Sequence, residues 1–175
     1  SLVQLCEIAD RIAVSLLSSS SSSSSTKWSK GSVVAFYSTN QHDYGAAVMG
    51  VQIAGGIAAL CTPAYKPREL AHQLRMTSAS VIITTADSYQ SAIEAAELAS
   101  DSSMEDPCEP IEKPRVLVFD EDHEASLLRT LLSPPQEAWQ KREELIKTVQ
   151  IDPAKDTALY CFRCVPLSPI MYAAC

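Results

Sequence analysis

Clusters of cysteine and carboxylate side chains are the first places where this chain could do chemistry. Cys161-Phe-Arg-Cys164 has the spacing at which two thiols bind a metal ion or exchange a disulfide. Tetrahedral zinc needs four ligands, and no second pair or nearby histidine is present, so the spacing does not predict a zinc site. Asp120-Glu-Asp122 could hold Mg²⁺ through oxygen. Adjacent carboxylates in a loop are more commonly only solvated, so this run does not predict a metal site either.

The histidines and glycines exclude several enzyme classes. His42, His72 and His123 lack the spacing of a zinc-protease helix. There is no G-x-S-x-G, so a hydrolase nucleophile is not predicted. Gly55-Gly56 ends a predicted helix, whereas a dinucleotide-binding fingerprint opens one. We therefore assign no catalytic residue and no metal ligand from these patterns.

The elements that must position any site alternate between strand and helix. Apolar, β-branched runs predict strands at residues 32–37, 57–61, 81–84, 115–119 and 157–162. Helical spacing and helix-start residues predict helices from Asn40 or Asp43 to residue 54, and at residues 68–76, 88–98, 123–132 and 135–149. Strands that alternate with helices pair in parallel through right-handed crossovers. The sequence thus predicts an α/β fold of alternating helices and mostly parallel strands.

Ligands in open α/β sheets bind at the carboxyl ends of the strands. The residues that follow the first two predicted strands are therefore the candidates for facing a ligand: Ser38, Thr39, Asn40, Gln41, His42, Cys61 and Tyr65. For His42, ordinary polarity at the start of a helix is the alternative.

The termini differ in composition from this regular centre. Residues 1–17 have apolar positions at helical spacing and predict an amphipathic helix. Residues 18–30 contain an unbroken serine tract and predict a flexible linker to an α/β domain at 31–162. Residues 163–175 contain two prolines and show neither the helical nor the strand periodicity of apolar residues, so we expect an atypical tail, disordered or artefactual.

Composition narrows the functional class. The chain has 175 residues, a formal net charge of −7 and no basic cluster, which argues against a nucleic-acid partner. Its six cysteines are scattered, mostly in apolar runs, as expected for reduced thiols in an intracellular protein. Residues 45–64 carry no charge over a transmembrane length, but Ala and Gly are abundant and Gly55-Gly56 divides the run. A buried helix followed by a buried strand is the better interpretation, with no transmembrane segment.

Five segments, in order, resemble those of AMP-binding acyl-CoA synthetases. They are residues 31–44 (GSVVAFYSTNQHDY), 49–56 (MGVQIAGG), 61–74 (CTPAYKPRELAHQL), 81–84 (VIIT) and 152–162 (DPAKDTALYCF). Each is weak alone, but their order and spacing agree with the family, and the 4-coumarate–CoA ligase-like and luciferase-like branch, including fungal members, is the most similar. The resemblance implies the partial N-terminal layer of an acyl-CoA synthetase-like fold. For the full-length family it also implies activation of a carboxylic acid as an acyl-adenylate and transfer to coenzyme A, with ATP and Mg²⁺.

The chain departs from the family after Phe162. The family continues into a Ser/Thr/Gly-rich loop ending in Pro-Lys-Gly, whereas this chain has no glycine after Gly56. We therefore expect a fragment that ends before the ATP-binding loop, binds none of these cofactors itself and is inactive alone. The location would be cytoplasmic or peroxisomal.

Two alternatives stay open. One is a non-catalytic α/β interaction module or remnant, which would self-associate through an exposed apolar face. The other is a flavodoxin-like small-molecule-binding domain, which would carry a nucleotide or flavin site within these residues.

Overall fold

The computed structural model describes residues 2–19, 28–120, 122–126 and 131–161, and at its centre lies a parallel sheet of five strands. The strand order is β4-β3-β1-β2-β5, and every neighbouring pair is parallel. The strands are β1 (Val33–Tyr37), β2 (Ile57–Cys61), β3 (Val81–Thr84), β4 (Arg115–Val118) and β5 (Leu159–Cys161). The predicted α/β class with parallel pairing is confirmed.

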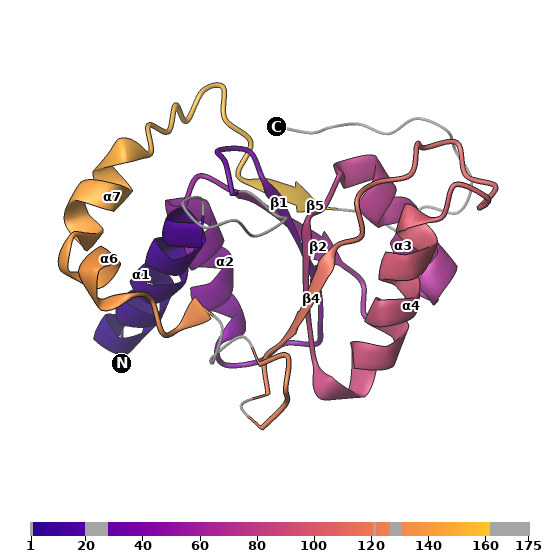
Figure 1. Cartoon of the computed structure of the whole chain (residues 1–175), viewed down its shortest axis with the longest axis horizontal. Coiled ribbons are helices and arrows are strands. Elements are labelled where there is room, and N and C mark those ends of the chain that lie inside the picture. The colour runs from indigo at the N-terminus through magenta and orange to yellow at the C-terminus, as the bar shows by residue number, and fades with distance from the viewer. Residues whose placement is uncertain (1, 20–27, 121, 127–130, 162–175) are drawn as a thin grey trace.

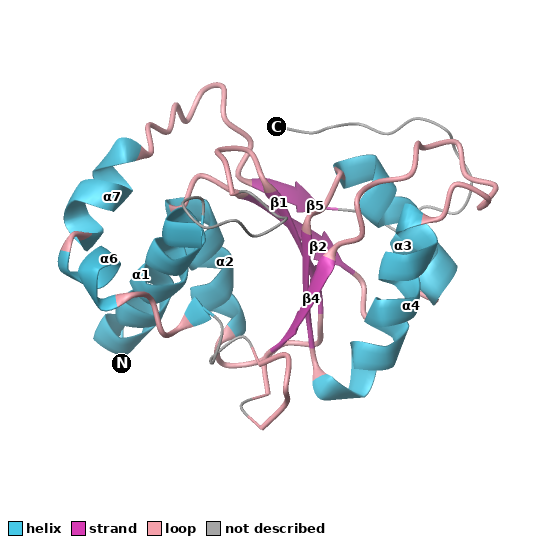
Figure 2. Ribbon diagram, viewed as in Figure 1, coloured by secondary structure: helices cyan, strands magenta, loops and turns pink. Residues whose placement is uncertain are grey.

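Helices cover both faces of the sheet (Figures 1 and 2). One face carries α1, α2, α6 and α7, and the opposite face carries α3 and α4. The helices are α1 (Leu2–Ser19), α2 (Tyr44–Ile53), α3 (Pro67–Thr77), α4 (Tyr89–Ser100), α6 (Gln136–Gln140) and α7 (Arg142–Thr148), with a 3₁₀ turn at Ala86–Ser88 before α4.

The central strand shows why the strands are continuous apolar runs. All five residues of β1 are buried. Val34 and Phe36 belong to the core beneath α1 and α2, whereas Ala35 and Tyr37 belong to the core beneath α3 and α4. A strand with helices on both faces has no solvent side, so its sequence does not alternate with polar residues.

Close approach of backbones explains the glycines around α2. A Cβ on Gly50 would lie 2.8 Å from the carbonyl oxygen of Ala9 in α1. A Cβ on Gly56 would lie 2.6 Å from the ring of Trp28, whose Nε1 donates to the carbonyl of Ala54 at 3.0 Å. Gly55 ends the helix at φ +74, a conformation that side chains rarely adopt. Gly50 is therefore needed for α1 to pack closely on α2, and Gly56 leaves room for the Trp28 ring at the end of α2.

Helix α1 is joined to the core of the sheet. Ile12, Ala13 and Leu16 are buried in the same cluster as residues of β1 and β3. The helix continues to Ser19, into the segment predicted as a linker, and the Ser18 hydroxyl donates to the carbonyl of Ser15 at 3.1 Å. Most of the predicted linker, at residues 20–27, and the whole predicted tail at 163–175 lie outside the described residues.

The uncharged run at residues 45–64 forms most of α2, then β2, as predicted for a buried helix and strand. None of the helices in the described part of the chain has the length and apolar character needed to cross a membrane.

Two predicted helices are wrong in detail. Residues 122–126 form turns in place of a helix beginning at residue 123, because the His123 Nδ1 atom accepts the Ala125 N–H at 3.1 Å and Ser126 bridges to Val118. The helix predicted at 135–149 is divided at Lys141 into α6 and α7. This break accompanies the packing of Trp139, whose ring lies 5.1 Å from the guanidinium carbons of both Arg11 and Arg142.

The start of α2 also differs from expectation. Asp43 directly precedes the helix, and it is one of the two residues predicted to start it. Its carboxylate, however, makes no capping hydrogen bond. That carboxylate lies 3.1 Å from Nε2 of His42 instead.

Candidate functional site

The carboxyl ends of the parallel strands all meet at one edge of the sheet. At this edge β1 leads into α2 on one face, whereas its neighbour β3 leads into α4 on the other face. The connections leave adjacent strands in opposite directions, which is the arrangement that creates a ligand-binding crevice in open α/β sheets. The loop at residues 38–43 lies at this crevice, where a ligand contact is predicted.

The predicted residues in this loop differ in exposure. Ser38 is buried, and its hydroxyl donates to the carbonyl of Thr39 at 2.7 Å. Thr39 and Asn40 are exposed, and Gln41 is half-buried. The His42 side chain is 89% exposed and is held only by Asp43. Of the predicted residues in this loop, those at 39–42 are therefore at least partly exposed to solvent, whereas Ser38 is not.

Hydrogen bonds fix the neighbouring strand ends. The buried Thr84 hydroxyl donates to the carbonyl of Tyr37 at 2.7 Å, joining the ends of β3 and β1. Asp120 Oδ2 accepts the N–H of Ala86 at 2.8 Å, and the N–H of Phe119 donates to the carbonyl of Thr84 at 3.0 Å. Asp120, considered above as a Mg²⁺ ligand, thus ties two loops together. Glu121 lies outside the described residues.

Cys61 and Tyr65 lie at the same edge, on the side covered by α3 and α4. Cys61 is buried, and burial raises the pKa of its thiol to about 12. It is therefore a neutral thiol at physiological pH, unsuited to nucleophilic attack. The carbonyl of Tyr65 accepts the Tyr37 hydroxyl at 2.7 Å. The structure thus brings both backbone positions to the predicted edge but buries the Cys61 side chain.

Aromatic rings close the other side of the edge. The Tyr44 ring lies 5.3 Å from that of Phe36 and 6.2 Å from that of Phe119, measured between centroids. Phe36 and Phe119 are buried in the core beneath α2. Tyr44, which follows the loop at residues 38–43 directly, is thus anchored to the core by two neighbouring rings.

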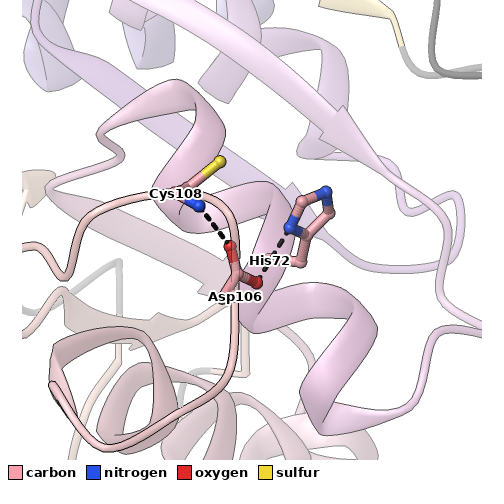
Figure 3. A group of neighbouring side chains, drawn as sticks. All are labelled: His72, Asp106 and Cys108. Atoms are coloured by element: carbon pink, nitrogen blue, oxygen red, sulfur yellow. Dashed lines mark hydrogen bonds and ion pairs between the residues drawn. The ribbon is translucent and has the colours of Figure 1, made fainter.

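A second cluster of chemically active groups lies away from this edge. His72 in α3 and Asp106 and Cys108 in the loop after α4 come together, as Figure 3 shows. His72 Nδ1 lies 2.9 Å from Asp106 Oδ2, and the Cys108 N–H donates to Asp106 Oδ1 at 2.8 Å. Burial of Asp106 raises the pKa of its carboxyl, but the hydrogen bonds from Cys108 and His72 outweigh that effect and lower the pKa overall.

Sequence reasoning did not find this cluster. His72 and Asp106 are 34 residues apart, and the only local signal is Asp106-Pro-Cys108, too short to be specific. The fold brings the three together by folding the loop back over α3.

Comparison with known proteins identifies a family that matches most of the chain. A sequence model of the family described as AMP-binding enzyme matches residues 4–162. A comparison with curated proteins gives no match.

Solved structures share the fold at low sequence identity. A long-chain fatty-acid–CoA ligase from Archaeoglobus fulgidus matches with a TM-score of 0.61 and 18% identity, over 91% of this chain and 26% of its own. MbtA from Mycobacterium smegmatis matches with a TM-score of 0.62 and 19% identity, over 91% and 25%. A luciferase-like enzyme from the nonluminescent mealworm Zophobas morio matches with a TM-score of 0.59 and 16% sequence identity, over 77% of this chain and 28% of its own. The chain therefore spans about a quarter of the length of these proteins.

Proposed function

The chain belongs to the AMP-binding enzyme family, and from this premise we propose that it forms the N-terminal α/β layer of a synthetase that activates a carboxylic acid as an acyl-adenylate and transfers the acyl group to coenzyme A. The observation that carries the proposal is the family match over residues 4–162, which includes every strand of the sheet. The similarity in fold to a fatty-acid–CoA ligase over 91% of the chain supports it.

The proposed full-length enzyme uses ATP, Mg²⁺ and coenzyme A. A phosphate-binding loop needs backbone N–H groups that converge on phosphate oxygens, and glycines usually allow that approach. Residues 57–175 contain no glycine, so these residues do not fit such a loop. We therefore expect this chain alone to catalyse neither adenylation nor thiol transfer.

The role we assign to this chain is to shape the substrate side of the enzyme. Thr39, Asn40, Gln41 and His42 stand on the strand edge where α/β enzymes bind ligands, and they are the proposed ligand-facing groups. Buried Ser38, with Cys61 and Tyr65, would act by fixing the backbone of the edge.

Two finer proposals rest on the family resemblance. The five resembling segments, taken together, favour the 4-coumarate–CoA ligase-like and luciferase-like branch, including fungal members. The second of these proposals is that the protein is located in the cytoplasm or in peroxisomes. A panel of hydroxycinnamic, benzoic and fatty acids would separate the branches by the acid that supports the reaction.

Carboxylate-dependent exchange between ATP and labelled pyrophosphate tests the proposal. The chain alone should give no exchange with any acid in the panel. The transcript should then be sequenced across the codon for Phe162, and any longer reading frame that includes a Ser/Thr/Gly-rich loop should be expressed. Carboxylate-dependent exchange by that longer product supports the proposal. Exchange by the 175-residue chain, or none by a folded longer product, contradicts it.

The two alternative functions predict other outcomes for the same sample. A melting-temperature increase with a flavin or nucleotide would favour the flavodoxin-like binding domain. Concentration-dependent dimers in light scattering would favour the interaction module. Leu2 and Val3, 76% and 75% exposed, and Ile151, 52% exposed, are the most exposed large apolar side chains of the described residues, so they are the positions to change first.

A further inference from the structure

We propose that His72, Asp106 and Cys108 form a binding site for a borderline-soft divalent cation, Zn²⁺, which adds a cross-link between the loop at residues 101–114 and α3 (Figure 3). The ion would be held by three protein ligands, at a place separate from the carboxyl edge of the sheet.

The geometry of the three side chains suits a small cation. Each offers one ligand atom, and these atoms all lie within 4.8 Å of one another. With bonds of about 2.0–2.3 Å, tetrahedral zinc holds neighbouring ligand atoms roughly 3.3–3.7 Å apart. Zinc binding would therefore require rotations of the His72 and Cys108 side chains that bring the ligand atoms to that separation. The His72 side chain is 39% exposed, which leaves a route for the ion and room for water as the fourth ligand.

The donor set selects the class of metal. One imidazole nitrogen, one carboxylate oxygen and one thiolate sulfur form a mixed set that favours zinc over the oxygen-binding Mg²⁺ and Ca²⁺. On binding, the Cys108 thiol loses its proton to solvent, so one thiolate and one carboxylate balance the two charges of the ion. A neutral complex of this kind is compatible with the neighbouring Arg75 guanidinium.

The loop is already held in place without a metal. Arg75, 4% exposed, donates from Nε to the carbonyl of Ala99 at 3.1 Å and from Nη1 to the carbonyl of Cys108 at 3.3 Å. The Ile111 N–H also donates to the Ala99 carbonyl, at 3.1 Å. The Asp106 side chain is only 3% exposed and accepts hydrogen bonds at both oxygens. Because the backbone of the loop is fixed beforehand, the site can bind an ion by rotation of side chains, without ordering the loop.

The binding test uses Zn²⁺ as the probe and the full chain with Cys161→Ser and Cys164→Ser, which removes the C-x-x-C thiols. Titration against a chromophoric chelator should give one Zn²⁺ per chain. His72→Gln or Cys108→Ser should weaken binding about tenfold or more, whereas Cys6→Ser, at an exposed cysteine in α1, should leave the affinity unchanged. Circular dichroism checks that each variant is folded. No stoichiometric binding, or equal affinity in the folded Cys108→Ser variant, overturns the proposal.

Thiol protection gives a second test that needs no change at the ligands. The same chain is treated with iodoacetamide with and without Zn²⁺, and modified cysteines are located by mass spectrometry. Zinc should slow alkylation of Cys108 about tenfold or more and leave Cys6 unaffected. Equal alkylation of Cys108 in both samples overturns the proposal, whatever the folding of the variants.

Discussion

Replacing Arg75 with methionine should lower the stability of the chain more than any conservative change at the surface of α3. The guanidinium is buried and donates to carbonyls at the carboxyl end of α4, those of Leu98 at 2.9 Å and Ala99 at 3.1 Å. It also bonds to the carbonyls of Asp101 and Cys108 in the following loop. The last carbonyls of a helix have no partner within the helix, and a cation there also interacts favourably with the helix dipole.

The expected loss of stability in Arg75→Met can be estimated from these hydrogen bonds. A hydrogen bond from a charged donor contributes about 1.5–3 kcal/mol. Of the four bonds, those to Leu98 and Ala99 are well formed, the bond to Asp101 is unusually short, and the bond to Cys108, at 3.3 Å, is weak. Counting mainly the two well-formed bonds, we expect Arg75→Met to lower the free energy of unfolding by about 3–5 kcal/mol. Methionine keeps much of the apolar stem, so little of the loss should come from packing. For a chain of this size the melting temperature should fall by roughly 6–20 °C.

Urea unfolding followed by circular dichroism measures this change from the midpoint at constant slope. Arg68→Met, on an exposed position of the same helix, is the matched control and should change stability by less than about 0.5 kcal/mol. A loss below about 1 kcal/mol for Arg75→Met would refute the reasoning, since it would mean that water replaces the guanidinium at these carbonyls at little cost.

Two further predictions concern packing and titration. Gly56→Ala should lower the free energy of unfolding by about 1–3 kcal/mol, because its Cβ would meet the Trp28 ring at 2.6 Å, whereas Gly45→Ala, with no atom within 4 Å, should not destabilise the chain in the same urea assay. The buried Cys61 thiol should resist alkylation at pH 8 until urea is added, while exposed Cys6 reacts at once. Because burial raises the folded pKa of Cys61 to about 12, its contribution to stability is present below the unfolded pKa and is lost as pH rises from about 9 toward 12. The alkaline loss of stability should therefore be smaller in Cys61→Ala, and an identical pH profile in both chains would contradict the assignment.

Local sequence was enough to determine the α/β class. Runs such as 33–37 and 81–84 carry no charge and are buried at every position, as expected for strands covered on both faces. Their alternation with helices then requires parallel pairing. The end of α2 was also predictable, because Gly55 has a backbone conformation that other residues rarely adopt. The candidate loop at residues 38–42 followed from its position after a strand.

Tertiary structure alone decided the strand order, the burial of Cys61 and the cluster of His72, Asp106 and Cys108. A strand that is apolar throughout does not reveal which face each side chain takes, so the sequence could not show that the Cys61 thiol lies beneath α3 and α4. It also could not show that Asp120 ties two loops together. Groups separated by 34 residues meet only after the loop folds over α3 and Arg75 fixes it there. The spacing of residues in the sequence does not predict such contacts, because they depend on the free energy of packing the whole chain.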